Sequence, residues 1–161
     1  NYDRRDFRME NDIQEWGYKF HMNDINAAIG LCNIANIDRI IDRHNTNFMK
    51  LYEMLCHLPD IQIQKMPPKS YSAAWVFSFA IINGNKVSFM EYMHNRGIMT
   101  SQIHRRNDTH SCVAKFAERL DGTTITEKQL ICVPCGWWCS DEDITTIGTS
   151  IIQYFQDQNY F

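Results

Sequence analysis

The sequence predicts a small α/β sandwich, in which a mixed or antiparallel sheet carries helices on one face. Three observations predict it. Apolar residues recur at helical spacing over residues 23–57 and again over residues 141–156. A mostly apolar run at residues 73–82 has the composition of a buried strand. The chain of 161 residues, 44% hydrophobic and 22% charged, is long and apolar enough for one domain with its own core.

The first predicted elements are an arm and a long helical region. Residues 1–16 are polar and irregular, and we expect them to form an incoming arm. Asn23 is a candidate N-cap, and Asp24 places a negative charge in the first helical turn. The apolar spacing that follows predicts one helix over residues 23–57, or two helices joined near residues 33–36.

Four segments are predicted to form the sheet. Residues 61–64 alternate between isoleucine and glutamine, which indicates a short strand. Residues 73–82 are expected to form its central strand because they are apolar apart from Ser78. Residues 98–103 and 131–134 are the two further predicted strands.

Helices are predicted between and after these strands. A helix at residues 86–95 is expected to end before Gly97, a residue suited to the position that follows a helix. A short helix is expected at residues 111–119. The last helix, residues 141–156, begins after Ser140 with the Ser-x-x-Asp pattern of a capped helix.

The composition argues against two classes of protein. A net charge of −3 at pH 7, with His104-Arg105-Arg106 as the longest basic cluster, predicts no nucleic-acid partner. No apolar run approaches the roughly 18–20 residues that span a membrane. Residues 1–6 are polar and charged, unlike a secretory signal. We therefore expect a cytoplasmic protein whose six cysteines are reduced thiols.

Three cysteines close together leave open a zinc or redox module. A fourth zinc ligand would have to come from Cys112, His104 or His110, at a spacing unlike that of structural zinc sites. The order Cys-Val-Pro-Cys does not open a helix directly, as a redox pair of the thioredoxin kind would. The three cysteines are Cys132, Cys135 and Cys139.

A more specific signal lies in residues 17–31, Gly-Tyr-Lys-Phe-His-Met-Asn-Asp-Ile-Asn-Ala-Ala-Ile-Gly-Leu. This segment resembles the hallmark of the DegT/DnrJ/StrS family of sugar aminotransferases, which typically shows Gly-Tyr-Asn-Tyr-Arg-Met, an acidic residue and Ala-Ala-Ile-Gly-Leu. Residues 74–79, 97–110 and 134–143 resemble later segments of the same family, in the same order. The resemblance thus covers nearly the whole chain.

The resemblance implies an aspartate-aminotransferase-like fold of type I, dependent on pyridoxal phosphate. Residues 17–161 would be its C-terminal small domain, and residues 1–16 an arm from the N-terminal domain. The parent enzyme would convert a nucleotide-linked keto-sugar to an amino-sugar with glutamate as amino donor. A perosamine-synthase-like role in cell-surface polysaccharide or lipopolysaccharide synthesis, by a homodimer, is the expected setting.

The same resemblance places the cofactor site across two subunits. In the family, the lysine that forms a Schiff base with the cofactor precedes the Gly-Tyr segment by some tens of residues. Only sixteen residues precede Gly17 here and none is lysine, so we expect that lysine to be absent and the isolated chain to be inactive. Tyr18 and Lys19 are expected to meet the phosphate of the partner's cofactor, with Lys19 in place of the family's asparagine.

Five residues are expected on the substrate side. His21 replaces an arginine that often meets substrate phosphate in the family. Against these roles stand simpler ones: a solvated loop at residues 104–110, and packing of Trp137-Trp138 or of Tyr18 and Phe20 on the long helix. The five residues are His21, His104, Arg106, His110 and Trp138.

Besides the zinc or redox module, two alternatives remain to the aminotransferase. One is a non-catalytic small α/β domain that binds a carbohydrate nucleotide. The other is a sugar dehydratase of the same family, in which histidine replaces the Schiff-base lysine at a position outside this chain.

Overall fold

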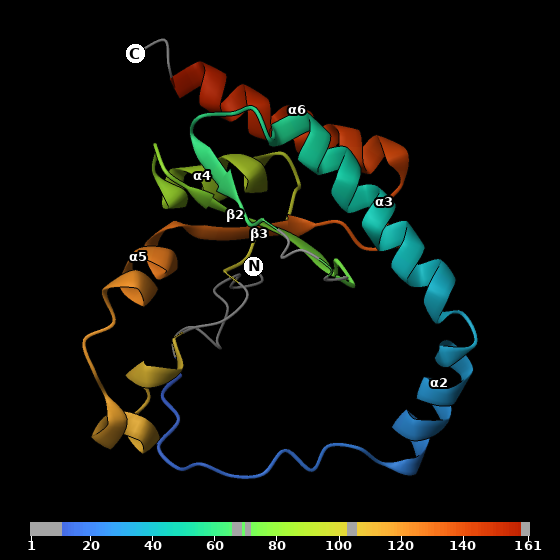
Figure 1. The fold of residues 1–161 in the computed structure, drawn as a ribbon, viewed down its shortest axis with the longest axis vertical. Helices are drawn as coiled ribbons and strands as arrows, with labels where there is room; N and C mark the ends of the chain where they lie inside the picture. Colours follow the sequence, from blue (N-terminus) through green and yellow to red (C-terminus); the bar gives the residue numbers. More distant parts are fainter. Residues whose placement is uncertain (1–10, 66–68, 70–71, 103–105, 159–161) are drawn as a thin grey trace.

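The computed structural model describes residues 11–65, 69, 72–102 and 106–158 of the chain. Figure 1 shows a small sheet with long helices above it and an extended N-terminal segment that runs well below it. None of the helices in these described ranges has the length and apolarity needed to cross a membrane. In chain order the elements are α2 (Asp24–Ile34), α3 (Ile37–Leu55), β1 (Ile61–Ile63), β2 (Val76–Ile81), α4 (Lys86–Asn95), the 3₁₀ helices η1 (Asn107–Thr109) and η2 (Ser111–Phe116), α5 (Asp121–Gln129), β3 (Leu130–Pro134) and α6 (Asp141–Gln158).

The sheet has three antiparallel strands in the order β1-β2-β3. The prediction of a central strand at residues 73–82 is confirmed, although the strand itself is shorter. Its side chains alternate, so that Phe77, Phe79 and Ile81 are buried on one face. This alternation gives the sheet a single strongly apolar face, which the helices must cover.

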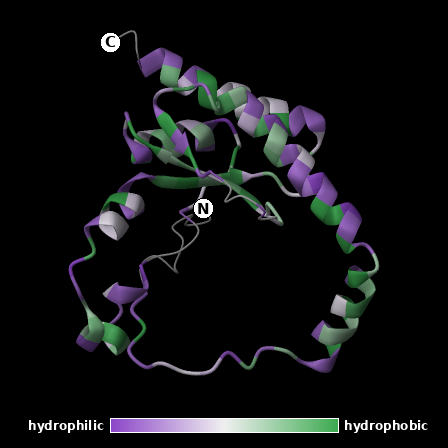
Figure 2. Ribbon diagram, in the orientation of Figure 1, coloured by the Kyte–Doolittle hydropathy of each residue, from purple (hydrophilic) through white to green (hydrophobic). Residues whose placement is uncertain are grey.

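The core lies between that face and helices α3, α4 and α6 (Figure 1). Phe79 and Phe89 meet edge to face with their ring centroids 5.8 Å apart, and Phe89 meets Tyr154 at 5.1 Å. Figure 2 shows the apolar colour concentrated on β2 and β3, while α3 and α6 alternate between apolar and polar residues. Helices on one face of an antiparallel sheet are what the sequence predicted.

Helix α3 shows why one face of a polar helix is buried. Its buried residues are His44, Asn47, Leu51 and Leu55, which recur at intervals of three or four. Full burial of a leucine side chain is worth roughly 1.5–3 kcal/mol, so the second half of this stripe supplies apolar stabilisation. The first half of the stripe, His44 and Asn47, is polar, and Asn47 hydrogen-bonds to the loop before α6.

Local signals set several helix ends as predicted. Asn23 Oδ1 accepts from the backbone N–H of Asn26 at 2.9 Å, which begins α2. The Ser140 hydroxyl and the Asp143 carboxylate cap each other's backbone N–H groups at 3.1 and 2.8 Å, which begins α6. At the end of α4, Gly97 has φ +74°, which only glycine adopts readily.

Helices α2 and α3 are separate, which confirms the alternative of two helices in this region. The backbone N–H of Asn36 turns back to the carbonyl of Asn33 at 2.9 Å and interrupts the helical ladder. Helix α2 has no buried residue, in contrast to α3. Helix α3 therefore packs on the core while α2 lies in solvent, and the break between them marks the edge of the core.

One local prediction is wrong, one is confirmed with a different helix type, and one element was missed. The predicted strand at residues 98–103 is reduced to an isolated bridge between Ser101 and Cys132, while residue 103 lies outside the described residues. Ile98 instead closes the end of α4, because its N–H bonds to Met93 O at 3.0 Å. The short helix predicted at residues 111–119 is the 3₁₀ helix η2. Helix α5 was not predicted at all.

Candidate functional site

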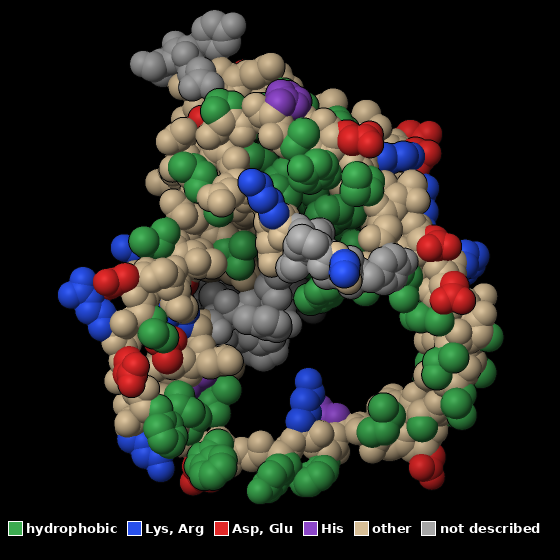
Figure 3. Space-filling model, viewed as in Figure 1, with side chains coloured by type: hydrophobic (Ala, Val, Ile, Leu, Met, Phe, Trp, Pro, Cys, Tyr) green, Lys and Arg blue, Asp and Glu red, His purple; other side chains and the backbone are tan. Residues whose placement is uncertain are grey.

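The segment Gly17–Met22 is extended and fully in solvent. Tyr18 is 84% exposed and Phe20 is 85% exposed. Their rings lie 5.5 Å apart, and the Phe20 N–H bonds to Tyr18 O at 3.2 Å. The simpler role for these aromatics, packing on the long helix, is therefore wrong for the described chain. Figure 3 shows the segment as a strip that stands clear of the main body, with hydrophobic side chains along its lower edge and a basic and a histidine side chain on the edge that faces the main body.

One end of this segment is fixed by an arm clasp, formed by Asp12 and Ile13 with His110, Ser111 and Cys112. The Ile13 N–H donates to His110 Nδ1 at 3.2 Å, and the Cys112 N–H donates to Ile13 O at 3.0 Å. The Asp12 carboxylate accepts from the Ser111 N–H at 2.9 Å and from the Ser111 hydroxyl. The other end of the segment is fixed by the Asn23 cap of α2.

Two predicted substrate residues, Arg106 and His110, already serve structural contacts. Arg106 binds the Asp108 carboxylate through two nitrogens, and its Nη1 donates to Thr124 Oγ1 at 2.6 Å. The Arg106 guanidinium lowers the pKa of Asp108 through this hydrogen bond. His110 is 8% exposed and faces the arm. The turn at residues 106–110 is thus an ordered structure and not a solvated loop; His104 lies outside the described residues.

Trp138 lies on the surface of the loop before α6, far along the chain from the arm. It is 62% exposed and Trp137 is 48% exposed, with the two rings 6.2 Å apart. Trp138 meets the His44 ring edge to face at 6.0 Å. Its ring also lies across Gly136, where an added Cβ would come within 2.3 Å of the indole. Core packing is therefore not the main role of these tryptophans in the described chain.

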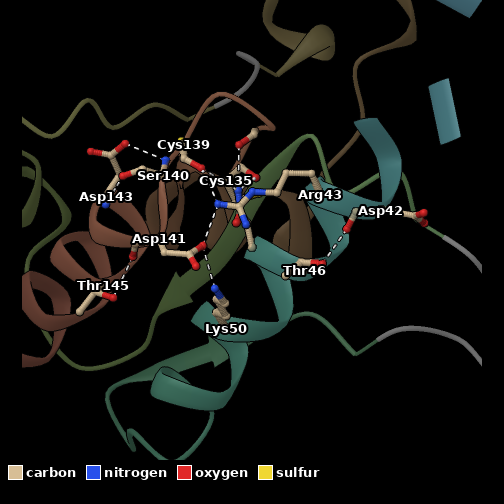
Figure 4. A network of polar contacts seen from close by, with 12 residues as sticks. Asp42, Arg43, Thr46, Lys50, Cys135, Cys139, Ser140, Asp141, Asp143 and Thr145 are labelled. Atoms are coloured by element: carbon tan, nitrogen blue, oxygen red, sulfur yellow. Dashed lines mark hydrogen bonds and ion pairs between the residues drawn. The ribbon is translucent and has the colours of Figure 1, made fainter. Parts of the chain in front are cut away.

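The loop that carries Trp138 is held by polar side chains of α3 (Figure 4). The Arg43 Nη2 donates to Cys139 O at 3.0 Å and to the Asp141 carboxylate at 2.8 Å. Lys50 lies 2.8 Å from the same carboxylate. These two cations lower the pKa of Asp141. Because Asp141 begins α6, the contacts join the start of that helix to α3.

The cysteine cluster is a set of buried thiols. Cys132, Cys135 and Cys139 are all buried. The thiol of Cys135 donates to Ala74 O at 3.0 Å, and burial raises its pKa to about 12. Among the described residues no three His, Cys, Asp or Glu side chains are grouped so as to hold a metal ion. The structure gives these thiols a packing role in the core.

Two hollows lie elsewhere on the described surface. One of about 230 Å³ is lined by residues of α3 and β2, including Phe48 and Val76. The other, of about 640 Å³, contains Lys86, whose ammonium donates to Gln102 Oε1 at 2.8 Å and to Glu127 O. Burial lowers the pKa of Lys86. None of the predicted site residues that the structure describes lines either hollow.

The predicted site residues therefore fall in three places in the described chain. Tyr18, Lys19 and His21 lie on the extended segment, Arg106 and His110 lie in the turn that holds its first end, and Trp138 lies on the loop before α6. The arm clasp joins the turn to the arm a few residues before the extended segment, through the Ile13–His110 hydrogen bond. The sequence did not reveal Asp12 or Ile13 as part of this arrangement, because nothing local marks them.

Comparison with known proteins gives a consistent result. The model of the DegT/DnrJ/EryC1/StrS aminotransferase family matches residues 2–152. The chain is similar to the crystal structure of the sugar aminotransferase CalS13 from Micromonospora echinospora, with 30% identity and a TM-score of 0.75 over 84% of this chain and 36% of that chain. It is also similar to AtS13 from Actinomadura melliaura, with 30% identity and a TM-score of 0.72 over 94% of this chain and 40% of that one.

A more distant structure shares the fold. It is Helicobacter pylori PseC, an aminotransferase involved in the biosynthesis of pseudoaminic acid, with 16% identity and a TM-score of 0.73 over 91% of this chain and 41% of that chain. The chain thus spans less than half the length of each of these three solved structures, between 36% and 41%.

Proposed function

The chain belongs to the DegT/DnrJ/EryC1/StrS aminotransferase family, and on that premise we propose that it is the C-terminal portion of an enzyme that aminates a nucleotide-linked keto-sugar. Glutamate would supply the amino group. The fold supports this proposal, since the chain resembles type I aminotransferases over 84–94% of its own length. Residues 17–161 would form the small domain, and residues 1–16 the arm that leads into it.

The observation that carries the proposal is the exposed segment Gly17–Met22. An extended run with Trp16, Tyr18, Phe20 and Met22 between 77% and 85% exposed leaves much apolar surface uncovered by its own chain. Such a surface suits a second subunit. We propose a homodimer in which this segment crosses to the partner.

The segment also offers groups that fit a cofactor phosphate. Lys19 is exposed and carries an ammonium with three donors, and the Tyr18 hydroxyl can add another. Charge-assisted hydrogen bonds of this kind are the stronger ones in proteins. Pyridoxal phosphate, when bound in the parent enzyme, supplies an electron sink for amino transfer. Lys19 and Tyr18 would hold its phosphate and so orient it, while the Schiff-base lysine would lie in another part of the parent protein.

The sugar side is proposed from the remaining residues. His21 lies two residues from Lys19 and would meet the substrate phosphate. His104 and Trp138 are proposed to contact the nucleotide-linked sugar, with the exposed Trp138 ring offering an apolar face. Arg106 and His110 would act on the same side by holding the 106–110 turn in shape. A perosamine-like product for cell-surface polysaccharide is the proposed setting.

Cofactor retention in the full-length gene product tests this proposal. A charge-assisted contact is worth about 1.5–3 kcal/mol, so Lys19→Ala is expected to weaken pyridoxal phosphate retention by roughly tenfold or more. Lys19→Arg should retain most of it, and Lys65→Ala, at an exposed lysine outside the segment, is the matched control. Retention at the wild-type level in Lys19→Ala would contradict the cross-subunit role.

Amino transfer itself is tested by adding glutamate to the same enzyme. The cofactor absorption should change with glutamate alone, because the amino group enters in the first half of a two-step reaction. An unchanged spectrum would instead favour the dehydratase of the same family.

A further inference from the structure

The arm clasp joins parts of the chain that lie far apart, and its central contact is a histidine. We infer that His110 is a positioning residue, which fixes the arm at Ile13 and thereby holds the segment Gly17–Met22 in its extended form. The two residues are separated by 97 positions, so the contact is made by the fold and not by local sequence.

The hydrogen-bond chemistry defines what His110 must supply. The group that meets it is a backbone N–H, which can only donate, so Nδ1 accepts and the ring hydrogen sits on Nε2. The side chain is 10% exposed, so water has little access to replace it. Asp12 Oδ1 lies 3.8 Å from the same nitrogen and is anchored to Ser111. The arm is thus gripped through both its backbone and a side chain.

The platform that carries His110 is itself tied to the sheet. The Thr109 hydroxyl donates to Arg106 O at 2.8 Å, which closes the turn. Arg106 donates to Thr124 Oγ1 on α5, and α5 runs directly into β3. Arg106 therefore stabilises the turn that carries His110, through its contacts with Thr109 and Thr124 and not through the arm.

Holding both ends of a segment lowers its freedom before it meets a partner. Residues 14–22 lie between the clasp and the Asn23 cap, and the Phe20–Tyr18 contact lies inside this stretch. A segment ordered in advance loses less conformational entropy when it binds. The purpose of this ordering rests on the proposed function, because it would keep Lys19 in place for the partner's cofactor phosphate.

The test uses this chain without cofactor and measures the arm directly by NMR. In His110→Ala the Ile13 amide should exchange with solvent about threefold to tenfold faster, the effect of losing one hydrogen bond. The backbone order parameter at Lys19 should fall as well. His110→Asn should restore both values, because its side-chain oxygen can accept where Nδ1 did. The amide of Asn26, held by the Asn23 cap, is the internal control and should not change.

Two further variants keep the result decisive. His57→Ala, at an exposed histidine beyond the end of α3, should leave Ile13 exchange at the wild-type rate. Asp12 is exposed on the arm, so Asp12→Ala is not expected to disturb folding. It should also speed exchange of the Ile13 amide, and it tests the clasp if His110→Ala fails to fold. Wild-type exchange at Ile13 in a folded His110→Ala, or in Asp12→Ala if His110→Ala fails to fold, would overturn the inference.

The inference and the proposed function fail separately. Faster exchange at Ile13 together with wild-type cofactor retention in Lys19→Ala would leave the clasp standing and remove its proposed purpose. Unchanged Ile13 exchange in His110→Ala, together with lost cofactor retention in Lys19→Ala, would instead support the proposed function and remove the clasp.

Discussion

The side-chain amide of Asn47 donates to the carbonyl oxygen of Gly136 at 2.9 Å, so that α3 fastens the loop before α6 from inside the core. The same Nδ2 lies 3.3 Å from Cys135 O and 3.5 Å from Cys139 O. Asn47 is fully buried. A loop whose carbonyls point inward needs a donor there, because an unpaired buried carbonyl is costly.

Removing that donor is expected to destabilise the fold. Asn47→Ala should lower the free energy of unfolding by about 1–3 kcal/mol, since the loop carbonyls lose their partner. Asn47→Asp should cost more, because a buried carboxylate would face the same carbonyl oxygens without a proton to donate. Urea unfolding measures both. Asn95→Ala, at the exposed end of α4, is the control; an effect of Asn47→Ala no larger than this one would contradict the role.

The buried thiols should resist modification. Burial raises the pKa of Cys135 to about 12, so its reactive thiolate is scarce at pH 8 and increases as the pH rises towards that value. Exposed Cys56 should react with a disulfide reagent at least about a hundredfold faster. Peptide mapping identifies the sites, and Cys56→Ser should remove the fast phase from that position. Rapid labelling of Cys135 in the folded chain would show that the loop opens freely.

Association should depend on α2. Ile29 is 56% exposed on this helix, which has no buried residue. We expect the chain to form a dimer or larger oligomer in light scattering, and Ile29→Lys to shift it toward the monomer by placing a charge in the covered surface. Ile125→Lys on α5 is the matched control, since Ile125 is 55% exposed. A clean monomer of the unmodified chain at high concentration would disprove the prediction.

Much of the fold follows from short-range signals. The bounds of α4 were predicted at Lys86 and Asn95, with Gly97 as the signal for its end; the structure adds a side-chain cap by Asn85 at its start. The start of α6 was predicted from Ser140 for the same kind of reason. These signals act within four residues, so a sequence displays them directly.

Errors arose where distant contacts decide the outcome. Helix α5 contains three threonines among nine residues and lacks a side-chain cap, so local propensity does not favour it. Its end is held from outside, by Lys86 bonding to Glu127 O. In the predicted strand at residues 98–103, Ile98 serves the end of α4, and of the described residues 98–102 only Ser101 pairs with β3.

The candidate site also has a part that local sequence predicts and a part that distant contacts decide. The segment at residues 17–31 could be found from its order of residues alone. That Arg106 and His110 hold structure could not, because their partners Thr124 and Ile13 lie 18 and 97 positions away. The roles of Tyr18, Lys19 and His21 toward a ligand stay predictions.

The arm clasp also sets an order of events during synthesis. Ile13 leaves the ribosome long before residues 110–112, the partners that the clasp gives it. Helices form within microseconds from local contacts, whereas a contact across 97 positions must wait for the chain that supplies it. Until residues 110–112 have been made, Trp16, Tyr18, Phe20 and Met22 are therefore an apolar stretch that the clasp does not yet hold. Such a stretch is a natural ligand for chaperones that bind apolar peptides, and docking of the arm would end that interaction.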